Sequence, residues 1–174
     1  ILGWSFPEKQ VRTSPVADLV RNPIASHAAA VPRLGLLHGD LDASGGVYAP
    51  FTSAQLGEAG ADAWLLGHIH KPSLPEGRSR EGVVPNRYLG ALVGLDPGEV
   101  GPRGPWLVRV DGRGDVTTRH LPIAPLRWER FELQVEPDEG PEDLGDRLLA
   151  EIVRVGEEIS LCADGLAESV DESR

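Results

Sequence analysis

Two histidines separated by a single residue, His68 and His70, follow a short apolar run that ends in a glycine, Ala63-Trp64-Leu65-Leu66-Gly67. Apolar runs of this length between breaker residues are typical of buried strands. Side chains of an extended chain alternate, so both imidazoles would point to one side, whereas a tighter turn would let them serve two different atoms. Imidazole binds zinc, manganese and iron, and open α/β sheets place their chemistry at the carboxyl ends of strands. The pair therefore indicates a metal site.

A second apolar run ends in the same way. Residues 34–37 are followed by His38, Gly39 and Asp40. One histidine at the end of a strand is most simply structural, and the His-x-His spacing by itself is short. Two such strand ends on one chain are better explained together, because the carboxyl ends of neighbouring parallel strands lie at the same edge of a sheet. The sequence therefore favours one shared metal site.

The elements around the histidines are predicted from local signals. Residues 52–55, Thr-Ser-Ala-Gln, form a capping box that predicts a helix to about Ala59, closed by Gly60. The chain then enters the strand before His68, and a helix followed by a buried strand is typical of a parallel sheet. Asp40 and Asp42 lie in the loop after His38. Paired aspartates among glycines favour a hydrogen-bonded turn over metal ligation.

Other elements follow from periodicity and turn chemistry. Short strands are predicted at residues 1–6, 83–93, 106–110, 116–121 and 127–135, and helices at residues 16–21 and 141–158. The turn at residues 111–114 makes a hairpin of the strands on either side. The helix at 141–158 has one apolar stripe, which we expect to be a core contact. Arg78 and Arg80 could meet phosphate, although an exposed loop is the simpler interpretation.

Several segments, in this order, resemble the calcineurin-like metallophosphoesterases. LLHGD and LLGHIHKP look like the last two metal-ligand motifs of that family. The segments GWSFP, YAPFTSAQL, YLGALVGLDPGEVGPRGPWLVRV and LPIAPLRWERFELQV resemble its DNA-repair exonuclease branch, whose nuclease subunits pair with coiled-coil ATPases. The similarity covers roughly residues 1–155. It implies an α/β fold, a metallophosphoesterase-type β-sandwich flanked by helices.

The resemblance also implies a chemistry. The family hydrolyses phosphodiesters with two metal ions, which clamp the attacking and leaving oxygens and lower the pKa of a bridging water. His38 and His68 would bind one metal and His70 the other. The metal would be manganese, with zinc or iron as alternatives. DNA would be the substrate, a coiled-coil ATPase or a second copy a possible partner, and the cytoplasm the location.

Three further ligand motifs of the family are absent. The chain contains no D-x-H, G-D-x-x-D or G-N-H. Gly39-Asp40 has Ala43 where the second aspartate would stand, and Gly114-Asp115 has Thr118 there. Three histidines cannot fill two coordination spheres, and no catalytic residue is assigned. A single zinc with three histidines and an open water position stays an alternative. We expect the chain to be the C-terminal half of such an enzyme and inactive alone.

This interpretation divides the chain into three parts. Residues 1–125 would be the C-terminal half of a metallophosphoesterase domain. Residues 126–158 would be a partial capping domain of one strand and one helix, and residues 159–174 a disordered acidic tail. Two alternatives stay open: a small-molecule phosphoesterase of the same fold, and a non-catalytic binding or assembly module.

Composition and charge limit the function classes. The chain has 174 residues, one cysteine and a net charge of −10. The single cysteine excludes an internal disulfide framework, and no apolar run is long enough to cross a membrane. Residues 1–125 hold 12 acidic and 12 basic side chains, whereas residues 126–174 hold 15 acidic and 5 basic ones. The acidic segment is therefore not a nucleic-acid surface, which should be basic.

Overall fold

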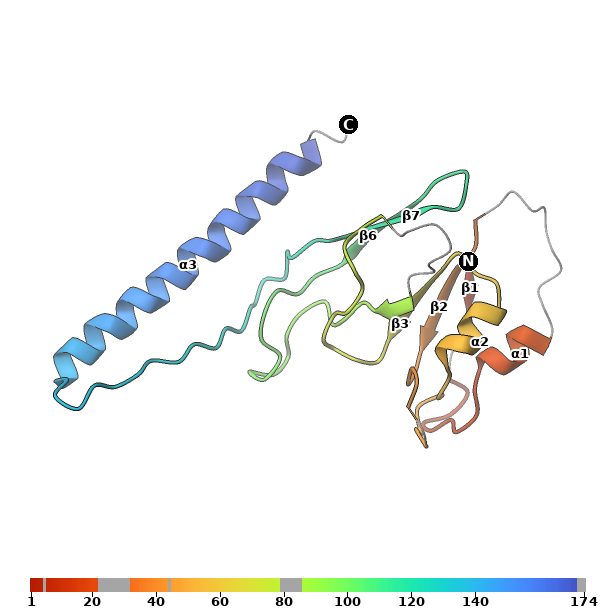
Figure 1. Ribbon diagram of the computed structural model, residues 1–174, viewed down its shortest axis with the longest axis horizontal. Coiled ribbons are helices and arrows are strands. Elements are labelled where there is room, and N and C mark those ends of the chain that lie inside the picture. Colours follow the sequence, from red (N-terminus) through yellow and green to blue (C-terminus); the bar gives the residue numbers. More distant parts are fainter. Residues whose placement is uncertain (5, 22–31, 44, 79–85, 172–174) are drawn as a thin grey trace.

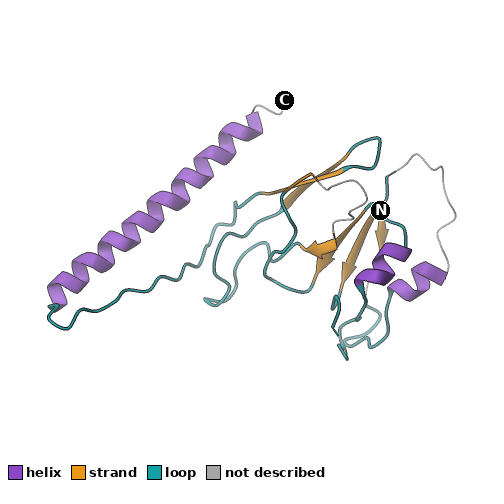
Figure 2. Cartoon of the chain, viewed as in Figure 1, coloured by secondary structure: helices purple, strands orange, loops and turns teal. Residues whose placement is uncertain are grey.

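The computed structural model describes residues 1–4, 6–21, 32–43, 45–78 and 86–171. They form a parallel sheet covered by two short helices, a small antiparallel sheet and a separate long helix (Figures 1 and 2). The elements in chain order are β1 (Leu2–Gly3), α1 (Val16–Arg21), β2 (Leu34–His38), α2 (Ser53–Glu58), β3 (Ala63–Gly67), β4 (Gly77–Arg78), β5 (Asn86–Tyr88), β6 (Trp106–Val110), β7 (Val116–His120) and α3 (Pro141–Asp171).

The parallel sheet has the strand order β1-β2-β3-β5. Its central strands pair in register from Leu34 opposite Ala63 to His38 opposite Gly67. The ends of the two apolar runs therefore lie side by side, as the sequence predicted.

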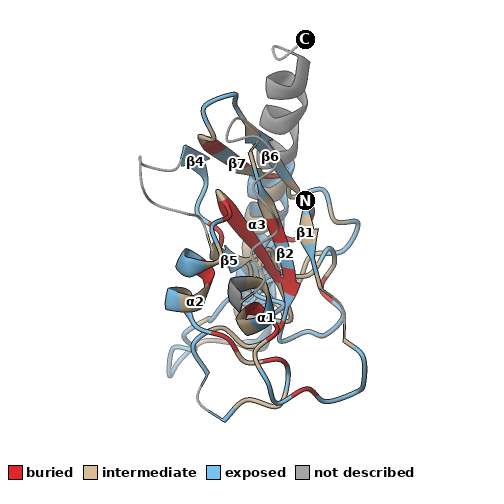
Figure 3. Cartoon of the chain, turned by 90° about the vertical axis from the view of Figure 1, so that its right-hand side faces the viewer, coloured by how far each residue is buried: buried red, intermediate tan, exposed pale blue. Residues whose placement is uncertain are grey.

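Helices α1 and α2 cover one face of this sheet, and the hydrophobic core lies between the helices and the sheet. The fully buried Trp64 and Leu66 of β3 face the helices, and Trp64 also donates through Nε1 to the carbonyl of Leu56 at 3.0 Å. The rest of the core is Val16, Leu37, Phe51, Leu56 and Ala61. Figure 3 shows the buried residues concentrated in β2, β3 and the chain beside them. On β2, Leu36 is 41% exposed, so part of the other face of the sheet is open.

The predicted cap of α2 is confirmed. Thr52 has an extended backbone and accepts from the backbone N–H of Gln55 at 3.2 Å. The Gln55 side chain in turn accepts from the backbone N–H of Thr52 at 3.0 Å, which completes the capping box. The helix ends at Glu58, and Gly60 adopts a positive φ of 68°.

The predicted hairpin is also confirmed. Strands β6 and β7 pair antiparallel from Trp106 opposite His120 to Val110 opposite Val116, and β4 adds to the outer edge of β7. Alternate residues of β7 are buried, with Val116 1%, Thr118 3% and His120 9% exposed. Thr117 and Arg119, which lie between them, are less buried, and this alternation with a period of two is typical of a half-buried strand.

The mixed α/β class is confirmed, with one parallel and one antiparallel sheet. The closer description as half of a metallophosphoesterase sandwich, and the three-part division of the chain, stay predictions. Three of the predicted strands are shorter or missing. The strand at residues 1–6 is limited to Leu2–Gly3, and the described part of the strand at 83–93 is limited to Asn86–Tyr88.

The strand predicted at residues 127–135 does not form. The alternating sequence favours a strand, but a strand needs a neighbour for its backbone hydrogen bonds. Here the only ladder contact within residues 127–135 is an isolated bridge between Val100 and Trp128. The Gly101 N–H donates to the Trp128 carbonyl at 2.8 Å, and the segment then runs extended toward α3.

The last helix differs most from the prediction. It begins at Pro141 as expected but continues to Asp171, past the expected end at residue 158, so most of the predicted disordered tail is helical. The apolar stripe is not a core contact, because Leu148, Leu149, Ile152 and Val153 are 41–61% exposed. Figure 1 shows α3 standing apart from the sheets.

Candidate functional site

His38 and His68 lie together at the carboxyl edge of the parallel sheet. His38 is the last residue of β2, and His68 directly follows β3. Their ring centroids are 5.3 Å apart, with an interplanar angle of 68°. Gly67 makes room for this arrangement, because a Cβ there would lie 2.9 Å from Nδ1 of His38. The pairing register of β2 and β3 thus brings together two of the three predicted metal ligands.

His68 has an unusual backbone. Its φ is 116°, a conformation that side-chain-bearing residues rarely adopt. Such strain costs free energy and is commonly found at functional sites. Here it directs Nε2 of His68 to Oδ1 of Asp40 at 3.0 Å, and the ring lies 5.0 Å from that of Tyr48.

Asp40 is held in place by the loop that returns from β2. Its N–H donates to the Tyr48 carbonyl at 2.9 Å, and its carbonyl accepts from the Phe51 N–H at 3.0 Å. Gly39 allows this close approach, because a Cβ there would lie 2.5 Å from the Ala49 carbonyl oxygen. The side chain of Asp40 therefore faces the histidines and not a local turn.

Asp42 has the structural role that the sequence predicted. Its carboxylate accepts from the backbone N–H of Ser53 at 2.8 Å and from the Ser53 hydroxyl at 2.7 Å. These two hydrogen bonds lower the pKa of Asp42 below its ordinary value. The residue joins the loop to the start of α2 and is not part of the histidine cluster.

His70, the third predicted ligand, is paired differently. Its Nδ1 lies 2.5 Å from Oε1 of Glu99, and Oε2 of Glu99 accepts from the Leu95 N–H at 2.9 Å. The hydrogen bond from His70, followed by that from Leu95, lowers the pKa of the Glu99 carboxyl. The backbone of His70 is also fixed, since its carbonyl accepts from the Ala91 N–H at 2.9 Å.

Sequence reasoning missed both carboxylate partners. Glu99 lies 29 residues from His70 in the chain, in a loop rich in glycine and proline. No local spacing connects the two. Asp40 stood close to His38 in sequence, but its loop composition favoured a turn. Its position two residues after a histidine at a strand end was the only signal available.

The electrostatics favour a neutral His38. Partial burial lowers its pKa, and the nearby His68 lowers it further, while Asp40 acts in the opposite direction. A histidine must be neutral to bind a metal, so this environment suits the predicted role.

The donors have the right chemistry for a divalent metal, but the described residues do not assemble a metal site. Among them, no group of three or more histidine, cysteine, aspartate or glutamate side chains is arranged to hold an ion. His68 faces Asp40, and His70 faces Glu99. The donor set of the described residues therefore does not fit a complete metal centre.

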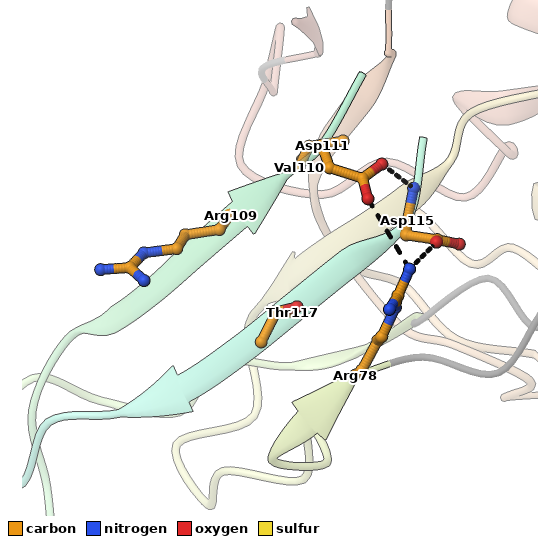
Figure 4. A pocket seen from close by; sticks show the side chains of 6 residues that line it. All are labelled: Arg78, Arg109, Val110, Asp111, Asp115 and Thr117. Carbon is orange, nitrogen blue, oxygen red and sulfur yellow. Dashed lines mark hydrogen bonds and ion pairs between the residues drawn. The ribbon is translucent and has the colours of Figure 1, made fainter. Parts of the chain in front are cut away.

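Of the two arginines that the sequence analysis considered for phosphate, Arg78 has a structural role. Arg78 in β4 forms ion pairs with Asp115 and, at 3.7 Å, with Asp111 (Figure 4). The Asp111 carboxylate also accepts from the Asp115 N–H at 3.1 Å, and Arg109 points away from the three. Arg78 is therefore engaged by the hairpin turn. Arg80 lies outside the described residues.

The site and fold define an α/β protein with paired histidines at the carboxyl edge of a parallel sheet. Comparison with known proteins adds one relative and no matching family model. The chain is 28% identical over 137 residues to the uncharacterized metallophosphoesterase YhaO of Bacillus subtilis. The match covers 78% of this chain and 31% of that protein, so the chain spans about a third of its relative.

This similarity supports a relationship to the metallophosphoesterase superfamily. It does not address the exonuclease branch. Within the described part of the chain, no helix is both long and apolar enough to span a membrane.

Proposed function

We propose that this chain is part of a metal-dependent phosphodiesterase of the DNA-repair exonuclease type. The observation that carries the proposal is the contact of His38 and His68 at the carboxyl ends of adjacent parallel strands. Two histidines from separate strand ends, one on a strained backbone, are expected where a site is built and not where a sheet merely packs. The similarity to a metallophosphoesterase supports the same chemistry.

In this proposal His38, His68 and His70 are metal ligands. The intact enzyme would use two ions, most plausibly manganese, to activate water against a DNA phosphodiester. A coiled-coil ATPase would be its partner. The remaining donors would come from outside this chain, because the described residues hold no complete ligand group. The chain alone would therefore turn over little or no substrate.

A non-catalytic assembly module is the second candidate. The lack of a complete ligand group among the described residues favours it. Capture of a coiled-coil ATPase, unchanged by chelator and by His68→Ala, would favour this second function.

Metal content per chain tests the proposal. The chain is loaded with Mn²⁺ or Zn²⁺, desalted and measured by mass spectrometry beside His68→Ala and His70→Ala, with His27→Ala as a control outside the motifs. We expect less than one ion per chain. A longer protein that contains this segment would supply the missing donors. Its metal content should rise to two ions per chain, and it should hydrolyse duplex DNA.

Three results would count against the proposal. If this chain alone hydrolyses a phosphodiester with Mn²⁺, and His68→Ala abolishes the activity, the predicted inactivity of the isolated chain is wrong. A longer protein that binds two ions but prefers small phosphoesters over DNA would replace the exonuclease by a small-molecule phosphoesterase. If His68→Ala and His70→Ala both leave the metal content of the longer protein unchanged, the histidines are not metal ligands.

A further inference from the structure

The helix α3 carries an apolar surface that the rest of the described chain does not cover. It spans 31 residues, and an extended segment separates it from the antiparallel sheet (Figures 1 and 2). The start of the helix is anchored by Arg147 in its second turn, which contacts the Glu139 carboxylate at 2.5 Å and donates to the Gln134 carbonyl at 3.0 Å. These contacts fix the entry of the helix and leave its apolar side open.

The apolar side is a continuous stripe. With about 100° of rotation per residue, Leu144, Leu148 and Val155 line up with Ile152 along one side of the helix. Leu149 and Val153 widen the stripe on one edge. Leu148 is 41% exposed, Leu149 61%, Ile152 51% and Val153 51%. Singly exposed apolar residues are ordinary, but a contiguous exposed stripe indicates an interaction site.

The two edges of the stripe differ in charge. On one edge Arg154 forms ion pairs with two carboxylates, Glu151 and Glu158, at 2.5 Å each. On the other edge, beside Leu149 and Val153, stand Asp146 and Glu157, both exposed. The two arginines of α3 are engaged with other carboxylates, so this second edge is an uncompensated acidic rim.

The charge of the whole helix limits what can cover the stripe. Residues 141–171 contain nine acidic and two basic side chains. A second copy of α3 would bring together two helices that each carry seven more acidic than basic side chains, and like charges across a helix interface are destabilising. An anionic membrane surface and a nucleic acid would be repelled for the same reason. Among these occupants, only a basic partner protein would be attracted by the negative charge of α3.

We propose that the apolar stripe of α3 binds a basic amphipathic helix of a partner protein. The partner helix would lay its own apolar face on Leu148, Leu149, Ile152 and Val153. Its lysines or arginines would meet the rim formed by Asp146 and Glu157. This is a helix-to-helix interaction in which apolar burial supplies affinity and charge selects the partner. It is independent of the histidine site and of the function proposed above.

The test uses the full chain and two synthetic peptides of about 20 residues, long enough to cover several turns. Both peptides carry the same leucine-rich apolar face. One has lysines beside that face, and the other has glutamates. We expect the basic peptide to bind at least about tenfold more tightly in fluorescence anisotropy, with a difference that shrinks at high salt.

Two variants place the same new charge at neighbouring positions, one inside the stripe and one outside it. Leu149→Asp lies in the stripe and should abolish binding of the basic peptide. Ala150→Asp lies outside the stripe, on the side of the acidic rim, and should not weaken binding of the basic peptide. Circular dichroism shows whether both variants keep their helix. In a third variant, Asp146→Lys with Glu157→Lys, the preference should reverse toward the acidic peptide.

Four results would overturn the proposal. Equal binding of both peptides would show that the acidic rim selects nothing. Binding unaffected by Leu149→Asp would place the contact elsewhere, and no binding of either peptide would show that the stripe is not a helix-docking surface. A stable dimer in sedimentation, lost in Leu149→Asp but kept in Ala150→Asp, would identify a second copy as the occupant.

Discussion

His70 donates through Nδ1 to Oε1 of Glu99 across 2.5 Å, and this bond joins two loops that are far apart in the chain. One carries the His-x-His pair, and the other follows β5. Glu99 also accepts from the Leu95 N–H, so its carboxylate is held from two directions. A carboxylate bound to one nitrogen of an imidazole fixes the ring orientation and leaves the other nitrogen available.

Removal of His70 should raise the pKa of Glu99. The hydrogen bond from His70 is the largest cause that lowers this pKa, so His70→Ala should return the pKa toward its ordinary value. The shift is measured by carbon-detected NMR titration of the Glu99 carboxyl. His68→Ala is the matched control, because His68 faces Asp40. A Glu99 pKa that is the same in all three proteins would show that the His70 contact is absent in solution.

The absence of a side chain at Gly67 should be required for the position of the His38 ring. An alanine Cβ at this position would lie 2.9 Å from Nδ1 of His38. Because that atom belongs to a movable side chain, Gly67→Ala should leave the fold intact but displace the ring of His38. Proton cross-peaks between the His38 and His68 rings should weaken or vanish. Cross-peaks as strong as those of the unchanged chain would contradict the crowding.

The elements that sequence reasoning found are those specified locally. The apolar runs of β2 and β3, the capping box at Thr52 and the turn between β6 and β7 each need only a few neighbouring residues. The meeting of His38 with His68 also followed, because parallel strands end at a common edge. These parts of the fold could be predicted without knowledge of the rest of the chain.

The parts that were missed depend on contacts between distant segments. Residues 127–135 alternate like a strand, but apart from the isolated bridge at Trp128 they have no neighbouring strand to pair with. Periodicity identified the start of α3 and its stripe, but it cannot say whether the stripe is covered. The carboxylate of Glu99 reaches His70 only through the loop after β5. In each case the pattern defines an element, and tertiary contacts define its surroundings.

Two glycine-to-alanine changes should shift the free energy of unfolding in opposite directions. At Gly35 a Cβ would lie 2.0 Å from Cε3 of the fully buried Trp64, so Gly35→Ala overpacks the core. We expect a loss of about 1–3 kcal/mol in the free energy of unfolding. Gly57 lies within α2 with nothing near its Cβ position, so Gly57→Ala should stabilise by about 0.5–1 kcal/mol. Denaturant unfolding measures both, and equal effects would contradict the packing of Trp64 against β2.

His120 should make the fold sensitive to mild acid. It is 9% exposed, its ring lies 4.8 Å from that of Trp106, and its Nε2 is buried without a hydrogen-bond partner. Burial lowers its pKa below the ordinary 6.5, and nearby Arg103 adds to this, while Glu76 and a backbone hydrogen bond with Gly104 oppose it. The unfolded chain therefore binds a proton at a higher pH than the folded chain does.

The sign of the effect follows from this difference. The stability that neutral His120 contributes is complete above pH 6.5 and is lost as the pH falls through the lower folded-state value. His120→Phe retains an aromatic ring beside Trp106 and cannot bind a proton, so its stability should fall less between pH 7 and pH 5. Denaturant unfolding at each pH measures the two slopes. Parallel slopes for His120→Phe and the unchanged chain would show that His120 is accessible to water and that the antiparallel sheet does not bury it.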